Sequence, residues 1–150
     1  IQVLSFLILV MASLSVYSQK YKTVADSGKL NLEYVKVSND IADLTAQLAA
    51  AQNKLPDYQA KATTAEAVAQ NAANSSSDQA SKATNGSVSD AKKANKKAKK
   101  AYNEAKDARS ANNNLSDQND KIAKLSSKLK KKQERLQESE VMRSAINATL

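Results

Sequence analysis

Apolar residues recur along most of this chain in steps of three and four. Between Ala91 and Ala108 the alanines follow one another in steps of 3, 4, 3, 4 and 3 residues. Such steps place one side chain per turn on a single face of an α-helix, and a sustained seven-residue repeat is typical of helices that pack lengthwise against other helices. The pattern predicts long helices and no compact globular core.

The same repeat continues with larger side chains on both sides of the alanine run. It is unbroken from Leu30 to Ala72, and Leu and Ile carry it from Leu115 to Leu136. Two successive steps of three, from Ala105 to Ala111, predict a local overwinding of the helix pair. We call the positions that face the other helix the seam. The expected seam residues are Tyr34, Ile41, Leu48, Leu55, Ala94, Ala98, Ala101, Ala105, Leu115, Ile122, Leu129 and Leu136.

A polar stretch separates the two halves of the repeat. Residues 71–89 are rich in Ser, Asn and other small residues and contain Asn85-Gly86, a strong turn dipeptide. Gly86 can adopt the positive φ that often ends a helix, and Ser87 or Ser89 could cap the next one. A chain folded back at Asn85-Gly86 forms an antiparallel hairpin.

The register of this hairpin is readable from the sequence. Folding about Asn85-Gly86 places Leu55 opposite Leu115 and brings alanines opposite alanines near the turn. We therefore predict an all-α fold: a long antiparallel coiled-coil hairpin, Ala-rich at its tip and Leu/Ile-rich at its base. The expected division is a signal peptide over 1–18, a first helical arm over 19–84 with a kink at Pro56, a turn over 85–89 and a second, basic arm over 90–150.

The first residues differ from the rest in having no charge. Residues 1–14 are almost entirely apolar, and the first charged side chain is Lys20. Val16 and Ser18 supply the small side chains that signal peptidase accepts before its cleavage site. We expect a cleaved secretory signal, truncated at its start. The Ser18-Gln19 junction followed by Lys20-Tyr21-Lys22 resembles signal peptides of the Bacteroidetes type, which implies a bacterial protein of the periplasm or cell surface. An uncleaved inner-membrane anchor and an N-terminal core element are the alternatives.

The composition excludes several kinds of chemistry. There is no His and no Cys in the chain. Zinc sites built from those ligands, Cys nucleophiles and Ser-His-Asp triads are therefore impossible. The sequence contains no glycine-rich phosphate loop and no metal-ligand pattern. We expect a protein that is not an enzyme, with no catalytic residue, cofactor or metal.

Charge is distributed unevenly between the two arms. Residues 19–87 hold seven Lys and seven acidic residues, whereas residues 88–136 hold 15 Lys and Arg against six acidic residues. The basic residues that could contact an anionic partner are Lys92, Lys93, Lys96, Lys97, Lys99, Lys100, Lys128, Lys130, Lys131, Lys132 and Arg135.

Three interpretations of the basic arm remain open. The simplest is a solvated face that keeps an Ala-rich helix soluble. The functional one is an anionic partner, such as lipid headgroups, a cell-wall polymer or an acidic protein surface. Nucleic acid is disfavoured, because an export signal precedes the arm and no aromatic or Arg-rich pattern accompanies the lysines.

Two functions fit these patterns. The leading hypothesis is a structural or scaffolding protein of the bacterial envelope, acting on itself or another envelope component through helix–helix contacts and the basic face. The alternative is a periplasmic holdase. In its size, charge, export signal and helical arms, the chain resembles the Skp/OmpH-like chaperones. That resemblance implies binding of unfolded proteins, but the chain lacks a strand pattern for the small β-containing body of that family.

Overall fold

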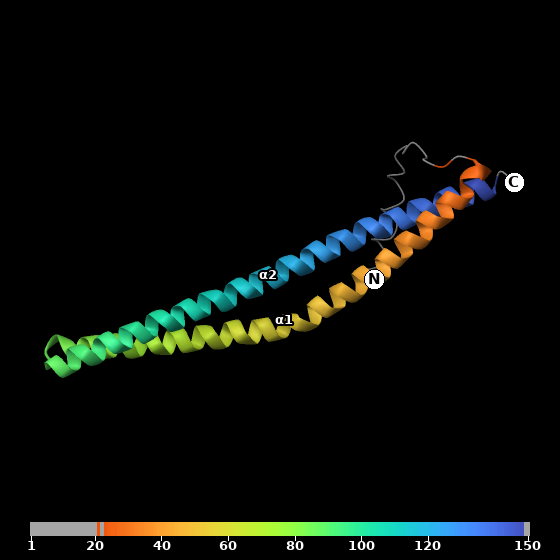
Figure 1. Ribbon diagram of the computed structural model, residues 1–150. Coiled ribbons are helices and arrows are strands. Elements are labelled where there is room, and N and C mark those ends of the chain that lie inside the picture. The colour runs from red at the N-terminus through yellow and green to blue at the C-terminus, as the bar shows by residue number, and fades with distance from the viewer. Residues whose placement is uncertain (1–20, 22, 149–150) are drawn as a thin grey trace, which may run out of the picture. The chain divides into compact units, whose positions relative to one another are not determined.

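The described part of the chain consists almost entirely of two long helices. In the computed structural model, Tyr21 and residues 23–148 are described. A short 3₁₀ helix, η2 (Val24–Asp26), leads into α1 (Ser27–Thr84), and α2 (Val88–Asn147) follows. The two long helices pack against each other, and no strand occurs among these residues (Figure 1). The fold is therefore the all-α hairpin that the sequence predicts. The expected signal peptide over 1–18 lies outside the described residues.

The chain divides into two units. The terminal unit comprises the described residues up to Ile41 together with those from Lys131 onward, and the turn unit comprises Ala42–Lys130. In each unit a stretch of α1 lies beside a stretch of α2 (Figure 1). Each unit thus has its own set of contacts between the helices, and each is described separately below.

The turn between the helices is short and closed by hydrogen bonds. Ser87 is the N-cap of α2: Asp90 N donates to Ser87 Oγ at 3.4 Å, and Ser87 N donates to Asp90 Oδ2 at 3.1 Å. This reciprocal pair is a capping box, which satisfies two backbone donors at the helix start. The structure thus selects Ser87, and not Ser89, as the cap.

Gly86 is required for a different reason from the one expected. No described residue, glycines included, has a positive φ. A Cβ added at Gly86 would instead lie 2.7 Å from the carbonyl oxygen of Lys82 and 3.0 Å from the Cβ of Asp90. The turn needs glycine because the ends of α1 and α2 approach too closely for any side chain.

Helix α1 continues through two segments that looked unfavourable for a helix. Pro56 lies inside α1 without a break in the helix. Its missing N–H deprives the carbonyl of Gln52 of a partner, but Pro56 and Gln52 are both exposed, so water can replace that donor. The Ser- and Asn-rich run up to Thr84 is also helical.

Burial along α1 follows a seven-residue repeat. Every seam position from Leu30 to Ala72 in steps of three and four is buried or half-buried, and the repeat extends through Ser76 and Gln79 to Ala83. The polar run therefore continues the seam with small and polar side chains instead of ending it. Tyr34, Ile41, Leu48 and Leu55 all lie at half-buried positions of this seam.

The seam of α2 differs from the expected one beside the alanine run. From Ala101 to Ile146 the buried and half-buried positions alternate in steps of three and four without interruption. Glu104 is half-buried, whereas Ala105 and Ala98 are exposed. With Glu104 and not Ala105 on the seam, the repeat no longer contains two successive steps of three. The expected overwinding of the helix pair is therefore absent. The other expected seam residues of α2 are half-buried, namely Ala94, Ala101, Leu115, Ile122, Leu129 and Leu136.

The terminal unit has a core of large side chains. Tyr21, Leu30, Met142 and Ile146 form one buried cluster, and Leu30 is completely buried. Met142 and Ile146 lie four residues apart, a spacing that places them on one face of α2, but the predicted seam ended at Leu136 and did not include them. Large apolar side chains remove the most area from water, and this unit therefore has the stronger core.

The turn unit has a thinner core. Its buried apolar residues are Ala51, Ala62, Ala108 and Leu125. Gln118 is buried among the seam positions, and its Nε2 donates to the carbonyl oxygen of Ala51 at 2.5 Å. Gln118 lies three residues after Leu115, and Ala51 lies four before Leu55, so this contact agrees with the predicted register to within one residue.

The close approach at Gly86 is testable by substitution. Gly86→Ala should lower the free energy of unfolding by about 1–2 kcal/mol, because the added methyl overlaps backbone that cannot easily move. Gly28→Ala is the matched control: nothing lies within 4 Å of the added Cβ, so the better helix former should stabilise α1 slightly. Thermal unfolding followed by circular dichroism measures both. Equal effects of the same sign would contradict this account of the turn.

Candidate functional site

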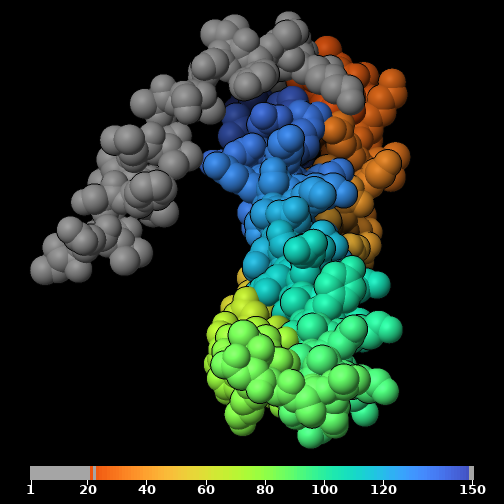
Figure 2. Space-filling view, turned by 90° about the vertical axis from the view of Figure 1, so that its left-hand side faces the viewer, coloured from red at the N-terminus to blue at the C-terminus, as the bar shows by residue number. Residues whose placement is uncertain are grey.

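Six lysines follow the turn closely on α2. We call them the turn cluster, and they are Lys92, Lys93, Lys96, Lys97, Lys99 and Lys100. All six are exposed. Figure 2 shows long side chains standing away from the green-to-cyan part of α2, which contains this cluster. The cluster presents a concentrated positive charge to solvent.

The spacing within the turn cluster brings like charges together. Lys96 lies three or four residues from Lys92, Lys93, Lys99 and Lys100, and Lys97 has the same relation to Lys93 and Lys100. Like charges at these helical spacings destabilise a helix by about 0.2–0.5 kcal/mol per pair. These lysines therefore lower the stability of the helix, and acidic residues at alternate positions would have avoided that loss.

Few acidic groups offset this charge locally. Residues 67–103 hold seven lysines and two aspartates. Asp90 Oδ1 lies 3.4 Å from Lys93 Nζ, but the Asp90 carboxylate also accepts hydrogen bonds from the backbone and side chain of the N-cap Ser87. Hydrogen bonds from the side chain and backbone of Ser87 lower the pKa of Asp90 below its ordinary value of 3.8. The turn cluster thus remains strongly positive.

The other basic residues expected to contact an anionic partner form the downstream group, which consists of Lys128, Lys130, Lys131, Lys132 and Arg135. Two of them take part in ion pairs between the helices. In the terminal unit, Lys132 Nζ lies 2.6 Å from Asp40 Oδ2. Their hydrogen bond lowers the pKa of the Asp40 carboxyl below 3.8. Lys132 stands on a seam position, so this pair joins α2 to α1. Its role here is structural, in contrast to the anionic-partner contact expected from the sequence.

Arg135 forms hydrogen bonds with two carboxylates, one on each helix. Its Nε and Nη2 donate to Glu33 Oε1 at 2.9 and 2.6 Å, and its Nη1 donates to Glu138 Oε2 at 2.9 Å. Hydrogen bonds to Glu138 and Glu33 raise the pKa of Arg135. Tyr21 Oη donates to the other oxygen of Glu33 at 2.7 Å. Arg135 therefore organises the terminal unit and is not available to an outside anion in this arrangement.

The remaining members of the downstream group are exposed. They are Lys128, Lys130 and Lys131, and Lys130 has an interaction of its own within the chain. Acidic residues accompany the lysines in this part of α2. Asp117 precedes Lys121 by four residues, and Asp120 precedes Lys124 by four. Opposite charges at this spacing stabilise a helix, so the turn cluster is the less compensated of the two basic groups.

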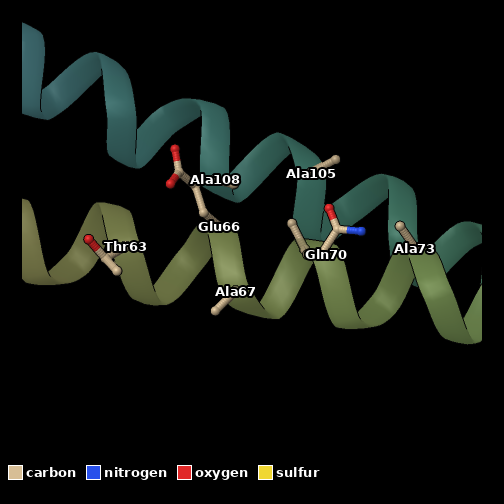
Figure 3. Close-up of a pocket in the computed structure, with 8 residues that line it drawn as sticks. Thr63, Glu66, Ala67, Gln70, Ala73, Ala105 and Ala108 are labelled. Atoms are coloured by element: carbon tan, nitrogen blue, oxygen red, sulfur yellow. The ribbon is translucent and has the colours of Figure 1, made fainter.

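A shallow groove runs between the helices of the turn unit. Its volume is about 650 Å³, and alanines make up most of its lining, including Ala67, Ala73 and Ala105 (Figure 3). Glu66 and Gln70 also line it, but the Glu66 Oε1 accepts a hydrogen bond from Asn112 Nδ2 at 2.7 Å. No second charged group converges on the groove, so it lacks the features of a catalytic pocket.

The described residues form neither a metal site nor a membrane span. Among these residues, no group of three or more Asp and Glu side chains lies close enough to hold a metal ion. None of the described helices is long and apolar enough to cross a membrane. The two basic groups and the exposed apolar residues are thus the main candidates for function.

Comparisons with known proteins give no relative for this chain. No family model matches it, and neither a curated protein nor a solved structure is significantly similar.

Sequence reasoning missed the polar contacts that join the helices. Gln118 and Ser139 are buried at seam positions. Gln118 donates across to the carbonyl oxygen of Ala51 in α1, whereas Ser139 Oγ donates within α2, to the carbonyl oxygen of Arg135 at 2.9 Å. Tyr34 was expected to pack, but its hydroxyl also donates to Glu140 and its ring lies 4.5 Å below the Arg143 guanidinium. The seven-residue repeat could have indicated that Gln118, Ser139 and Tyr34 lie on the seam. It could not have indicated their hydrogen-bond partners.

The structural role of Arg135 is testable. Arg135→Gln should lower the free energy of unfolding by about 1–2 kcal/mol, because it leaves Glu33 without its charged hydrogen-bond donor. Arg109→Gln, at an exposed position of α2, is the control and should change stability by less than about 0.5 kcal/mol. Urea unfolding of the two variants measures the difference. Equal losses would contradict a structural role specific to Arg135.

Proposed function

We propose that this chain is an exported coiled-coil scaffolding protein of the bacterial envelope. In this proposal the hairpin binds further helices, from a second copy or from another envelope component, and its basic face contributes to the contact. The signal-like residues 1–18 support export, and the seven-residue burial pattern of both helices supports coiled-coil packing. The protein acts through its surface and catalyses no reaction.

The observation that carries the proposal is the double alanine stripe of α2. Ala94, Ala101 and Ala108 lie on the seam, whereas Ala98 and Ala105 lie beside it and are exposed. Small side chains allow another helix to approach closely, since the distance between packed helices depends on the side chains at the contact. The exposed stripe therefore suits a third helix in the turn unit.

Exposed apolar side chains in the terminal unit support the same idea. Leu32 is 74% exposed and Val35 is 55% exposed, both on α1, and Val141 of α2 is 48% exposed. Leu32 and Val35 lie three residues apart and are therefore neighbours on the surface of α1. Exposed apolar patches commonly mark contacts with other proteins. They are consistent with helix–helix contacts in this unit as well.

Cross-linking in the native envelope tests the proposal. The full chain should capture one partner, itself or another protein, at fixed stoichiometry. Ala98→Glu with Ala105→Glu should abolish that capture, because two carboxylates would be buried in the new contact. The control variant, Asn103→Glu with Asn114→Glu, adds the same charge at exposed positions off the stripe and should retain the partner.

Two outcomes would contradict the proposal. Capture of many unfolded outer-membrane proteins at variable stoichiometry would favour the holdase alternative. Equal capture by the stripe variant and its control would show that the alanine stripe is not the contact surface.

A further inference from the structure

The turn cluster differs from an ordinary solvated helix face. Six pairs of its lysines lie three or four residues apart, and no acidic residue stands between Ala91 and Ala101. A helix face that served only to keep the protein soluble would remain soluble if Lys alternated with Glu. Other parts of α2 combine Asp and Lys in this way. The unbalanced cluster destabilises its own helix, so its charge favours a role in binding an anion.

The arrangement of these lysines around α2 restricts the shape of the partner. At 100° per residue, the six side chains cover roughly 160° of the helix circumference. A flat surface can contact only one side of such an array. A flexible chain can bend around it and meet lysines on both flanks.

We propose that the turn cluster binds a flexible, linear phosphate-bearing polymer of the cell envelope. This inference rests on the proposed function, because it names the partner of the basic face. Each lysine supplies a compact charge with three rotatable donors, which can meet a phosphate without demanding a fixed geometry. A row of such groups suits a polymer whose phosphates are not held rigidly in place.

Two other anionic partners fit the same surface less well. Helices that lie in a membrane interface combine basic residues with large apolar side chains, and the only apolar residues between Lys92 and Lys100 are Ala94 and Ala98. Single-stranded nucleic acid is held by bases stacked on aromatic side chains, and the cluster itself contains none. Tyr102, which is 72% exposed, is the nearest aromatic residue and is included in the test.

The test measures binding of the full chain to fluorescent inorganic polyphosphate at several salt concentrations. With five or six phosphates contacted, the slope of log affinity against log salt should be roughly −3.5 to −4, as for single-stranded polyanions. The turn-cluster variant, Lys96→Gln, Lys97→Gln, Lys99→Gln and Lys100→Gln, should lose at least about tenfold in affinity at low salt. Its slope should become shallower by nearly 3.

A matched variant removes the same charge elsewhere. It carries Lys54→Gln, Lys106→Gln, Lys121→Gln and Lys124→Gln, and its affinity should change by less than about threefold. Circular dichroism checks that both variants remain helical. The turn-cluster variant should be at least as stable as the native chain, because the substitutions remove repulsion between neighbouring lysines.

Several outcomes would overturn this inference. Equal losses in the two variants would mean that net charge alone attracts the polymer. Tighter binding to vesicles containing phosphatidylglycerol would favour a membrane surface. Tighter binding to single-stranded DNA of equal charge, lost on Tyr102→Ala, would favour nucleic acid. If polymer binding fails while the alanine-stripe partner is still captured, this inference fails and the proposed function stands.

Discussion

The continuous seven-residue repeat on both helices is the constraint on which the rest of the structure depends. Each helix has one stripe of apolar positions that is buried away from water, and within the described part of the chain the other helix covers it. This requirement fixes the antiparallel pairing, the register in which Gln118 meets Ala51, and the outward direction of the remaining side chains. It also explains how α1 can include Pro56 and a Ser- and Asn-rich run, since neither interrupts the stripe.

The same constraint separates structural charges from candidate binding charges. Lys132 and Arg135 lie on or beside the seam and form ion pairs with Asp40 and Glu33 of α1. The turn cluster stands largely away from the seam, and Lys93 of the cluster pairs with Asp90 in the first turn of α2. Side chains facing the other helix thus hold each unit together, whereas the lysines of the turn cluster and the alanine stripe are exposed to solvent.

Much of the hairpin could be predicted because periodicity and turn chemistry act locally. The steps from Leu30 to Ala72 and the Asn85-Gly86 turn specify the helices and their register without further information. Ala105 was expected on the seam in place of Glu104 because alanine is apolar and glutamate is charged, although Glu104 is the residue that keeps the steps of three and four regular. The hydrogen bonds of Gln118 and Arg135 depend on partners far away in the sequence.

Pairing of Ala51 with Gln118 is the most direct test of the hairpin and its register. The chain has no native cysteine, so cysteines introduced at these two positions report on each other alone. Ala51→Cys with Gln118→Cys should form a disulfide within single chains rapidly under mild oxidation, because the two positions are adjacent. Ala51→Cys with Asn119→Cys, which moves one cysteine to an exposed neighbouring position, should form it far more slowly. Equal rates for the two pairs, or cross-links only between chains, would contradict the antiparallel hairpin.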